Sequence, residues 1–167
     1  KVWRLDENGT WYAEYEVTAV DADARTVDLM SKQGREVKGV ARDDVLIDAA
    51  EAAALRKDVA AYVAATRDLG PVVAARFANE GAEIMDPRTC TMINLNNKDL
   101  SAAGAMPPAA AWKRLPKLEA LILRSAALPA NGLEDVLAGC PRLTHLNLAR
   151  AKFEACEGGL PAAVDQI

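Results

Sequence analysis

One pattern of apolar positions occurs three times in the second half of the chain. Each copy has apolar residues at its first, fourth, sixth and eleventh places, and the copies begin at Cys90, Leu118 and Leu143. The starts lie about 25 to 28 residues apart, a period typical of repeats that supply one short strand and one return segment. Such a unit cannot bury its apolar side chains alone, so the pattern predicts three units stacked on one another.

The same pattern predicts which side chains point out of the stack. The third, fifth, seventh and eighth places of each copy flank the buried fourth and sixth places, and stacking aligns them across the copies. This outward ladder combines amides, arginines and exposed apolar side chains, a mixture that suits a protein partner. We therefore predict a partner-binding surface formed by Met92, Asn94, Asn96, Asn97, Ile122, Arg124, Ser125, His145, Asn147 and Arg150.

The first 48 residues show the alternation of a small β structure. Between residues 11 and 20, every second position is apolar or aromatic, which predicts a strand with Ala13, Tyr15, Val17 and Ala19 on one face. Turn-forming residues separate this strand from shorter apolar segments before and after it. Five short strands joined by tight turns predict a curled sheet or small barrel.

The middle of the chain, residues 49–83, is predicted to be helical. Asp48 can cap a helix that begins with an alanine-rich run. Gly70 and Pro71 end this helix and start a second one, which we expect to end near Gly81. These helices are placed to cover the amino-terminal end of the stack. No corresponding cap follows the third copy, so we expect more repeats or a partner beyond Ile167.

Residues 90–160 resemble the leucine-rich repeat family through the apolar places described above. The resemblance implies a strand-lined stack that binds proteins. The family usually has Asn or Cys at the ninth place, where this chain has Lys98, Ala126 and Ala151, so we expect a short and locally irregular stack. The predicted fold class is α+β, with a small barrel at 1–48, a helical linker and cap at 49–83, and repeats at 84–167.

Residues 1–48 resemble the Tudor-like and wider SH3-like barrels. The positions that carry this resemblance are Trp3, residues 6–12, residues 17–21, Val27 and Gly34. Tudor domains often hold methylated lysine or arginine in an aromatic cage, and Trp3 and Tyr12 fall on two cage positions, with Met30 and Gln33 on the other two. The resemblance implies a candidate ligand site at Trp3, Tyr12 and Met30. It also implies an alternative function, a chromatin- or RNA-associated reader of methylated or arginine-rich peptides.

Composition and charge narrow the classes of partner. The formal net charge is −4 at pH 7 and the isoelectric point is about 5.1. Both values argue against direct nucleic-acid binding. The acidity is concentrated in the first 48 residues. No apolar run approaches the ~20 residues that span a bilayer, so we expect no membrane partner. Cys90, Cys140 and Cys156 have no CxxC spacing, which predicts reduced thiols in an intracellular protein, cytoplasmic or nuclear.

Residue types suited to catalysis are sparse. His145 is the only histidine, so a four-ligand zinc site lacks ligands, and a cysteine–histidine nucleophile pair would need a cysteine on the outward ladder. Gly158 and Gly159 are not followed by the Lys-Ser or Lys-Thr of a phosphate-binding loop. We expect no catalytic residue, no metal and no cofactor. The predicted function is a non-enzymatic scaffold or adaptor that binds protein partners, within a larger assembly.

Overall fold

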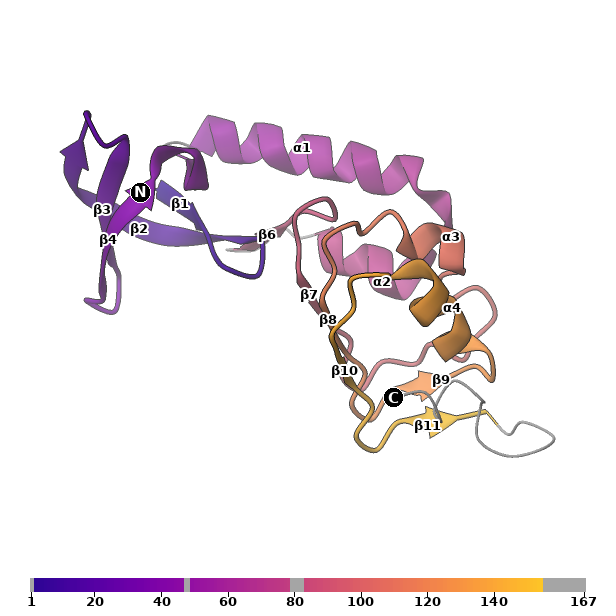
Figure 1. Ribbon diagram of the computed structural model, residues 1–167. Helices are drawn as coiled ribbons and strands as arrows, with labels where there is room; N and C mark the ends of the chain where they lie inside the picture. Colours follow the sequence, from indigo (N-terminus) through magenta and orange to yellow (C-terminus); the bar gives the residue numbers. More distant parts are fainter. Residues whose placement is uncertain (1, 47–48, 79–82, 155–167) are drawn as a thin grey trace.

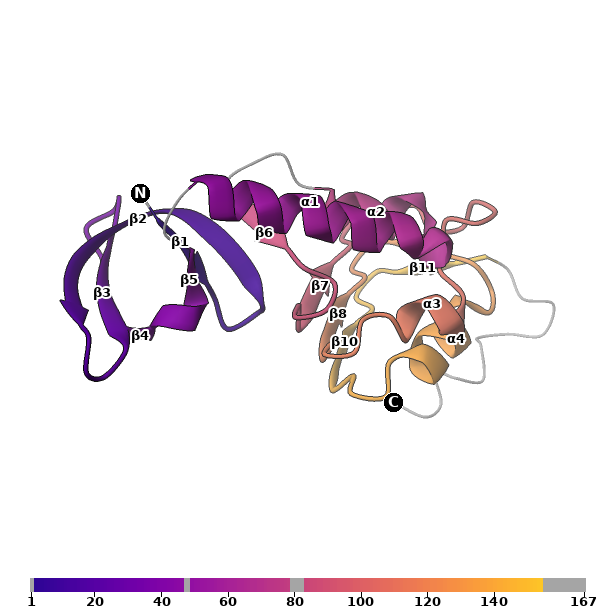
Figure 2. The ribbon, with the colours of Figure 1, turned by 90° about the horizontal axis from the view of Figure 1, so that it is seen from above.

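The computed structural model describes residues 2–46, 49–78 and 83–154 of a mixed α+β chain. Its amino-terminal part is an antiparallel sheet, in the order β4-β3-β2-β1-β5, that curls into a half-barrel (Figures 1 and 2). A sixth strand from later in the chain, β6 (Glu83–Met85), pairs with the first residues of β2. The other strands are β1 (Val2–Leu5), β2 (Thr10–Asp21), β3 (Thr26–Ser31), β4 (Glu36–Ala41) and β5 (Val45–Leu46), with a 3-10 turn η1 (Arg42–Asp44) before β5.

The inside of this curled sheet is a small core of aliphatic side chains. It buries Val2, Val27, Leu29, Val40 and Val45, with Tyr15 and Val37 packed against them. The outer end of β2 lies away from this core, since Val17 is 41% and Val20 is 70% exposed. Val17 pairs with the buried Leu29, but after a shift in the β2–β3 register Ala19 pairs with Asp28, so the single face predicted for residues 13 to 19 is wrong at Ala19.

Helices connect the sheet with the repeats. α1 (Ala49–Ala65) runs alongside both parts, and a 3-10 turn η2 (Arg67–Leu69) leads into α2 (Gly70–Phe77), as Figures 1 and 2 show. α2 ends at Phe77, before the predicted end near Gly81. Both Gly81 and the predicted helix cap Asp48 lie outside the described residues.

The carboxyl-terminal part contains two parallel sets of short strands. β7 (Met92–Asn94), β8 (Ala120–Ile122) and β10 (His145–Asn147) form a parallel sheet in the order β10-β8-β7. β9 (Ala127–Leu128) and β11 (Lys152–Phe153) form a second parallel pair, which an isolated bridge between Asp99 and Ala127 extends. The returns between strands carry α3 (Ala109–Trp112) and α4 (Gly132–Gly139).

One apolar core runs from the curled sheet into the repeats. It includes Trp11 of β2, Phe77 of α2, Ile84 of β6 and the buried leucines of the repeats, with Trp112 fully buried among them. β6 therefore ties the sheet to the repeats, although it lies at the predicted start of the repeat segment. The division of the chain at residues 48 and 83 stays a prediction.

The turn between β1 and β2 continues the hydrogen-bond pattern of the repeats at their amino-terminal end. Thr144 N–H donates to Glu119 C=O (2.8 Å), and Glu119 N–H donates to Thr91 C=O (2.8 Å). Thr91 N–H in turn donates to Asn8 C=O (2.9 Å), in the β1–β2 turn. The turn thus occupies the place that a preceding repeat would have, and it satisfies a donor that the first repeat would otherwise leave open.

Candidate partner-binding face

The surface of the parallel sheet β10-β8-β7, with the turns that follow its strands, forms what we call the strand face. Ile93, Leu95, Leu121 and Leu123, at the fourth and sixth places of the first two repeats, have no exposed surface. The side chains at the third and fifth places alternate with them and lie on the outer side. In the third repeat, Leu146 and Leu148 are half-buried, so the burial of this edge is incomplete among the described residues.

Strand pairing brings the predicted ladder residues into rows. His145 pairs with Ala120, which pairs with Met92, and Asn147 pairs with Ile122, which pairs with Asn94. The seventh and eighth places are also aligned, because Asn97 N–H donates to Arg124 C=O (2.9 Å) and Ser125 N–H donates to Ala149 C=O (2.9 Å). The backbones of the ten residues predicted from the sequence therefore lie in adjacent rows, although Asn96 Oδ1 is buried without a hydrogen-bond partner.

The turns after the three strands have one common geometry. The eighth residue of each repeat has a left-handed backbone, with φ of 57° at Asn97, 55° at Ser125 and 60° at Arg150. The ninth residue then donates its N–H to the carbonyl of the sixth, at 3.2, 3.1 and 2.9 Å in the three repeats. The turns are therefore regular despite Lys98, Ala126 and Ala151, because the backbone bond needs no Asn or Cys side chain. The returns are not alike, since α3 has four residues and α4 has eight.

Two asparagines of the strand face support these turns with their side chains. Asn94 Oδ1 accepts a hydrogen bond from Asn96 N–H (3.0 Å), and Asn147 Oδ1 accepts one from Ala149 N–H (3.0 Å). Ile122 occupies the equivalent place in the middle repeat. The centre of the strand face is therefore apolar. The side-chain oxygens of the two asparagines on either side of it already accept a hydrogen bond from the backbone.

Charged groups differ between the two ends of the strands. Near the amino ends, Arg142 forms an ion pair with Glu119, with 2.9 Å between Nη2 and Oε1, and the His145 ring lies 3.0 Å from the Thr144 hydroxyl. At the carboxyl ends, Arg124 and Arg150 are exposed and form no ion pair with any described residue. The carboxyl-terminal end of the strand face therefore carries exposed positive charge.

The residues of the second candidate site, on the curled sheet, do not come together. Trp3 packs against the main core, and the Arg56 guanidinium covers its ring at 4.9 Å from the centroid. Tyr12 lies opposite Arg4, the neighbour of Trp3, so Trp3 and Tyr12 point to opposite faces of the sheet. Met30 is on β3, opposite Glu16. Burial and the nearby carboxylates of Glu83 and Asp6 raise the pKa of Tyr12.

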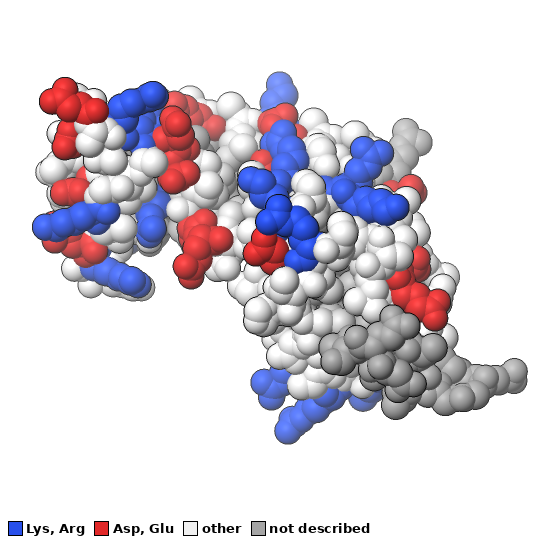
Figure 3. All heavy atoms as spheres, viewed as in Figure 1, with Lys and Arg blue, Asp and Glu red and all other residues white. Residues whose placement is uncertain are grey.

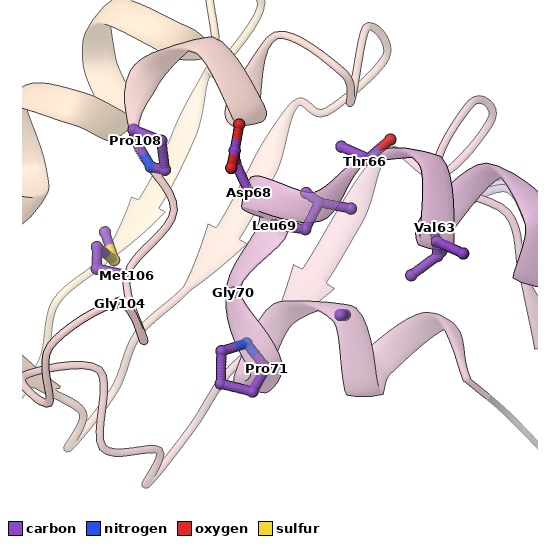
Figure 4. Close-up of a pocket in the computed structure, with 11 residues that line it drawn as sticks. Val63, Thr66, Asp68, Leu69, Gly70, Pro71, Gly104, Met106 and Pro108 are labelled. Carbon is purple, nitrogen blue, oxygen red and sulfur yellow. The ribbon is translucent and has the colours of Figure 1, made fainter.

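The sequence did not predict a pocket that lies where the helices meet the first repeat return. Figure 4 shows its walls, which come from the end of α1, η2, the start of α2 and the loop at 104–108, and its volume is about 600 Å³. The lining is mainly apolar, with Leu69, Pro71, Met106 and Pro108 beside the polar Thr66 and Asp68. The lining contains no lysine, arginine or histidine, and the Thr66 hydroxyl donates to Tyr62 C=O (3.0 Å).

The described residues hold few groups suited to catalysis or metal binding. Burial raises the pKa of the Cys90 thiol to about 12 and that of Cys140 to about 11, so both are protonated at neutral pH. Within residues 2–46, 49–78 and 83–154, no group of three His, Cys, Asp or Glu side chains could hold a metal ion. No helix in the same ranges is long and apolar enough to cross a membrane. Cys156, Gly158 and Gly159 lie outside these ranges.

Comparison with known protein families, curated proteins and solved structures finds no match for this chain. The resemblances to leucine-rich repeats and to Tudor-like barrels therefore rest on residue pattern alone. Function has to be inferred from the strand face and its surroundings.

Proposed function

We propose that this chain is a non-enzymatic protein–protein interaction module that acts within a larger assembly. In this proposal a small SH3-like barrel and a helical cap support a short leucine-rich repeat stack, and the partner lies on the strand face. The observation that carries the proposal is the in-register alignment of the outward places of three parallel strands. Because the backbone fixes these rows, the side chains on them are held in place before a partner arrives.

The chemistry of the strand face supports a protein as the partner. Ile122 is half-exposed at its centre and Met92 lies in the neighbouring row, while amides and arginines surround them. Apolar centres with polar and arginine-rich rims are common in protein interfaces. Three strands at ~4.8 Å spacing span only about 10 Å. A partner of ordinary interface size therefore contacts more than the three rows.

Affinity purification with matched variants tests this proposal. Quantitative mass spectrometry compares the proteins that co-purify with the wild type, with the strand-face variant Ile122→Glu/Met92→Glu, and with the control variant Glu134→Lys. Glu134 is an exposed residue of α4, away from the strand face. We expect a subset of proteins to be lost with the strand-face variant and retained with Glu134→Lys, provided that thermal melting shows all three to be folded. Equal retention of every co-purifying protein by the strand-face variant would contradict the proposal.

The alternative predicted from the sequence, a reader of methylated or arginine-rich peptides, stays a prediction. A peptide that used Trp3 would have to displace Arg56 from its ring, and Tyr12 would contact it from the opposite face of the sheet. Titration with such peptides, followed by tryptophan fluorescence, tests this alternative. The cytoplasmic or nuclear location also stays a prediction.

A further inference from the structure

The positive charge at one end of the strand face indicates which kind of partner segment binds there. We define the turn edge as the seventh to tenth places of the three repeats, directly after β7, β8 and β10. Besides Arg124 and Arg150, it contains Lys98 at the ninth place of the first repeat and Lys152 at the tenth place of the third. All four side chains are exposed. In Figure 3, Lys and Arg atoms gather at this end of the repeats.

The backbone holds these four residues in neighbouring turns. Ala127 N–H donates to Lys98 C=O (3.0 Å), and Lys152 N–H donates to Ala126 C=O (2.8 Å). Residue 127 is also paired with Lys152 between β9 and β11. The hydrogen bond from Asn97 N–H to Arg124 C=O also joins the turn of the first repeat to the turn of the second. The four cations therefore come from three consecutive turns, about 5 Å apart from one repeat to the next.

One carboxylate, Asp99 at the tenth place of the first repeat, also lies on the turn edge, so the edge has four cations and one anion. Asp99 accepts hydrogen bonds from the hydroxyl (2.7 Å) and the N–H (3.0 Å) of Ser101, and these bonds lower its pKa. None of the four cations forms an ion pair with any residue that the structure describes. By contrast, Arg142 at the opposite end of the strands is paired with Glu119. The turn edge is thus open to a partner's negative charge.

We propose that the turn edge binds an acidic segment of the protein partner, with carboxylates at alternate positions of an extended chain. Alternate side chains of an extended peptide are ~6.8 Å apart, so two or three carboxylates reach across the three turns. An acidic protein segment fits better than a nucleic acid, because the acidic first 48 residues and the net charge of −4 repel a long polyanion. This inference rests on the proposed function, since the same partner contacts the strand face.

The test uses the whole chain and a defined probe. The probe is an acetylated, fluorescein-labelled twelve-residue peptide with Glu at alternate positions and Val or Ser between them; a second peptide has Gln in place of Glu. A single-stranded oligonucleotide of equal charge is the third ligand. Fluorescence anisotropy is measured at 50 and 300 mM salt. The protein variants are Arg124→Glu with Arg150→Glu, and a control with the same charge change, Lys113→Glu with Lys117→Glu, whose exposed residues precede β8.

We expect the Glu peptide to bind at least tenfold more tightly than the Gln peptide at 50 mM salt, and to lose most of this preference at 300 mM. The Arg124/Arg150 variant should weaken Glu-peptide binding roughly tenfold or more, whereas the Lys113/Lys117 control should change it less than threefold. No binding of the Glu peptide at millimolar concentration, equal loss in both variants, or preferential binding of the oligonucleotide would each overturn the proposal.

One further variant separates this inference from the proposed function. Ile122→Ser removes the apolar side chain from the strand face and leaves the charge of the turn edge unchanged. If the Glu and Gln peptides bind alike and Ile122→Ser removes both, the strand face binds proteins but the acidic preference is wrong. If the Glu peptide binds with the expected preference and Ile122→Ser has no effect, the turn edge acts alone and the proposed strand face is wrong.

Discussion

Gly9 lies directly against Thr89, across the junction between the β1–β2 turn and the first repeat. A Cβ atom on Gly9 would stand 2.1 Å from the Thr89 carbonyl oxygen, and the backbone φ of Gly9 is +74°. Close by, the Thr89 hydroxyl donates to Gly9 C=O (3.3 Å). Only glycine can adopt the left-handed backbone easily and leave room for the Thr89 carbonyl. Gly9 therefore allows the curled sheet and the repeat stack to come into contact.

Gly9→Ala should therefore destabilise the protein strongly. We expect a loss of about 2 to 4 kcal/mol in the free energy of unfolding, from backbone strain and from overlap with Thr89. Gly34→Ala is the matched control, because Gly34 has φ +77° and a Cβ atom added there would meet nothing within 4 Å. This control should lose only about 1 kcal/mol. Denaturant melts measure both values, and equal losses would show that the contact with Thr89 adds nothing.

The left-handed backbone at the eighth place of each repeat predicts one substitution that stabilises the protein and one that destabilises it. Ser125 has φ 55°, whereas the first repeat has Asn97 at the same place with φ 57°. Because asparagine tolerates this conformation better than most residues, Ser125→Asn should stabilise the protein by roughly 0.5 kcal/mol. Ser125→Val should destabilise it by about 1 kcal/mol or more, since a β-branched residue is strained there. Thermal melts that shift in the same direction for both variants would contradict this view of the turn.

Arg88 should stabilise the contact between α1 and the first repeat. Its Nη2 lies 2.7 Å from Asp86 Oδ2 and 2.6 Å from Asp58 Oδ2, and the Asp86 side chain is only 7% exposed. Arg88→Ala leaves the buried Asp86 carboxylate without its cation, so we expect a loss of about 2 kcal/mol. Asp58→Asn should lose less than about 1 kcal/mol, because Asp58 is exposed. Urea unfolding distinguishes the two, and similar losses would mean that Asp86 needs no cation.

The buried thiols predict a loss of stability at high pH. In the folded protein the pKa of Cys90 is raised to about 12 and that of Cys140 to about 11, from an ordinary value of 9.0. Their stabilising effect is complete below pH 9 and decreases as the pH rises toward these folded values, because only the unfolded chain releases the protons. By pH 10 we expect a loss of about 1 kcal/mol for each thiol.

Unfolding free energies between pH 8 and 10.5, in a Cys156→Ser background, measure this effect. Cys90→Ala should reduce the slope at high pH, since one of the two buried thiols is then missing. In the same background, reaction with a thiol reagent at pH 8 should require unfolding, because both side chains are buried. Rapid labelling of the native protein would contradict the burial of these thiols.

The repeated apolar places predicted the strand positions of the second half well, because each place decides burial by itself. Ile93, Leu121 and the leucines two residues later are fully buried as the alternation requires. The side chains at the ninth place were a poorer guide to the turns. They suggested irregular turns, whereas a backbone hydrogen bond from the ninth to the sixth residue maintains the same turn in each repeat.

The sequence could not predict features that depend on contacts between distant segments. The bond from Thr91 N–H to Asn8 C=O and the pairing of β6 with β2 join residues far apart in the chain. The aromatic positions of the candidate barrel site were predicted correctly as strand residues, but their faces depend on the β1–β2 register, which shifts after Val2. Alternation alone does not reveal such a shift.

Hydrogen exchange locates the part of the chain that a bound protein partner covers. The protein is measured alone and with a purified partner from the affinity experiment, and protection is mapped by mass spectrometry. We predict that protection concentrates in the peptides that cover residues 92–98, 120–126 and 145–152, with little change in α3 and α4. Protection confined to α3, α4 or the curled sheet, with these three segments unchanged, would contradict the account.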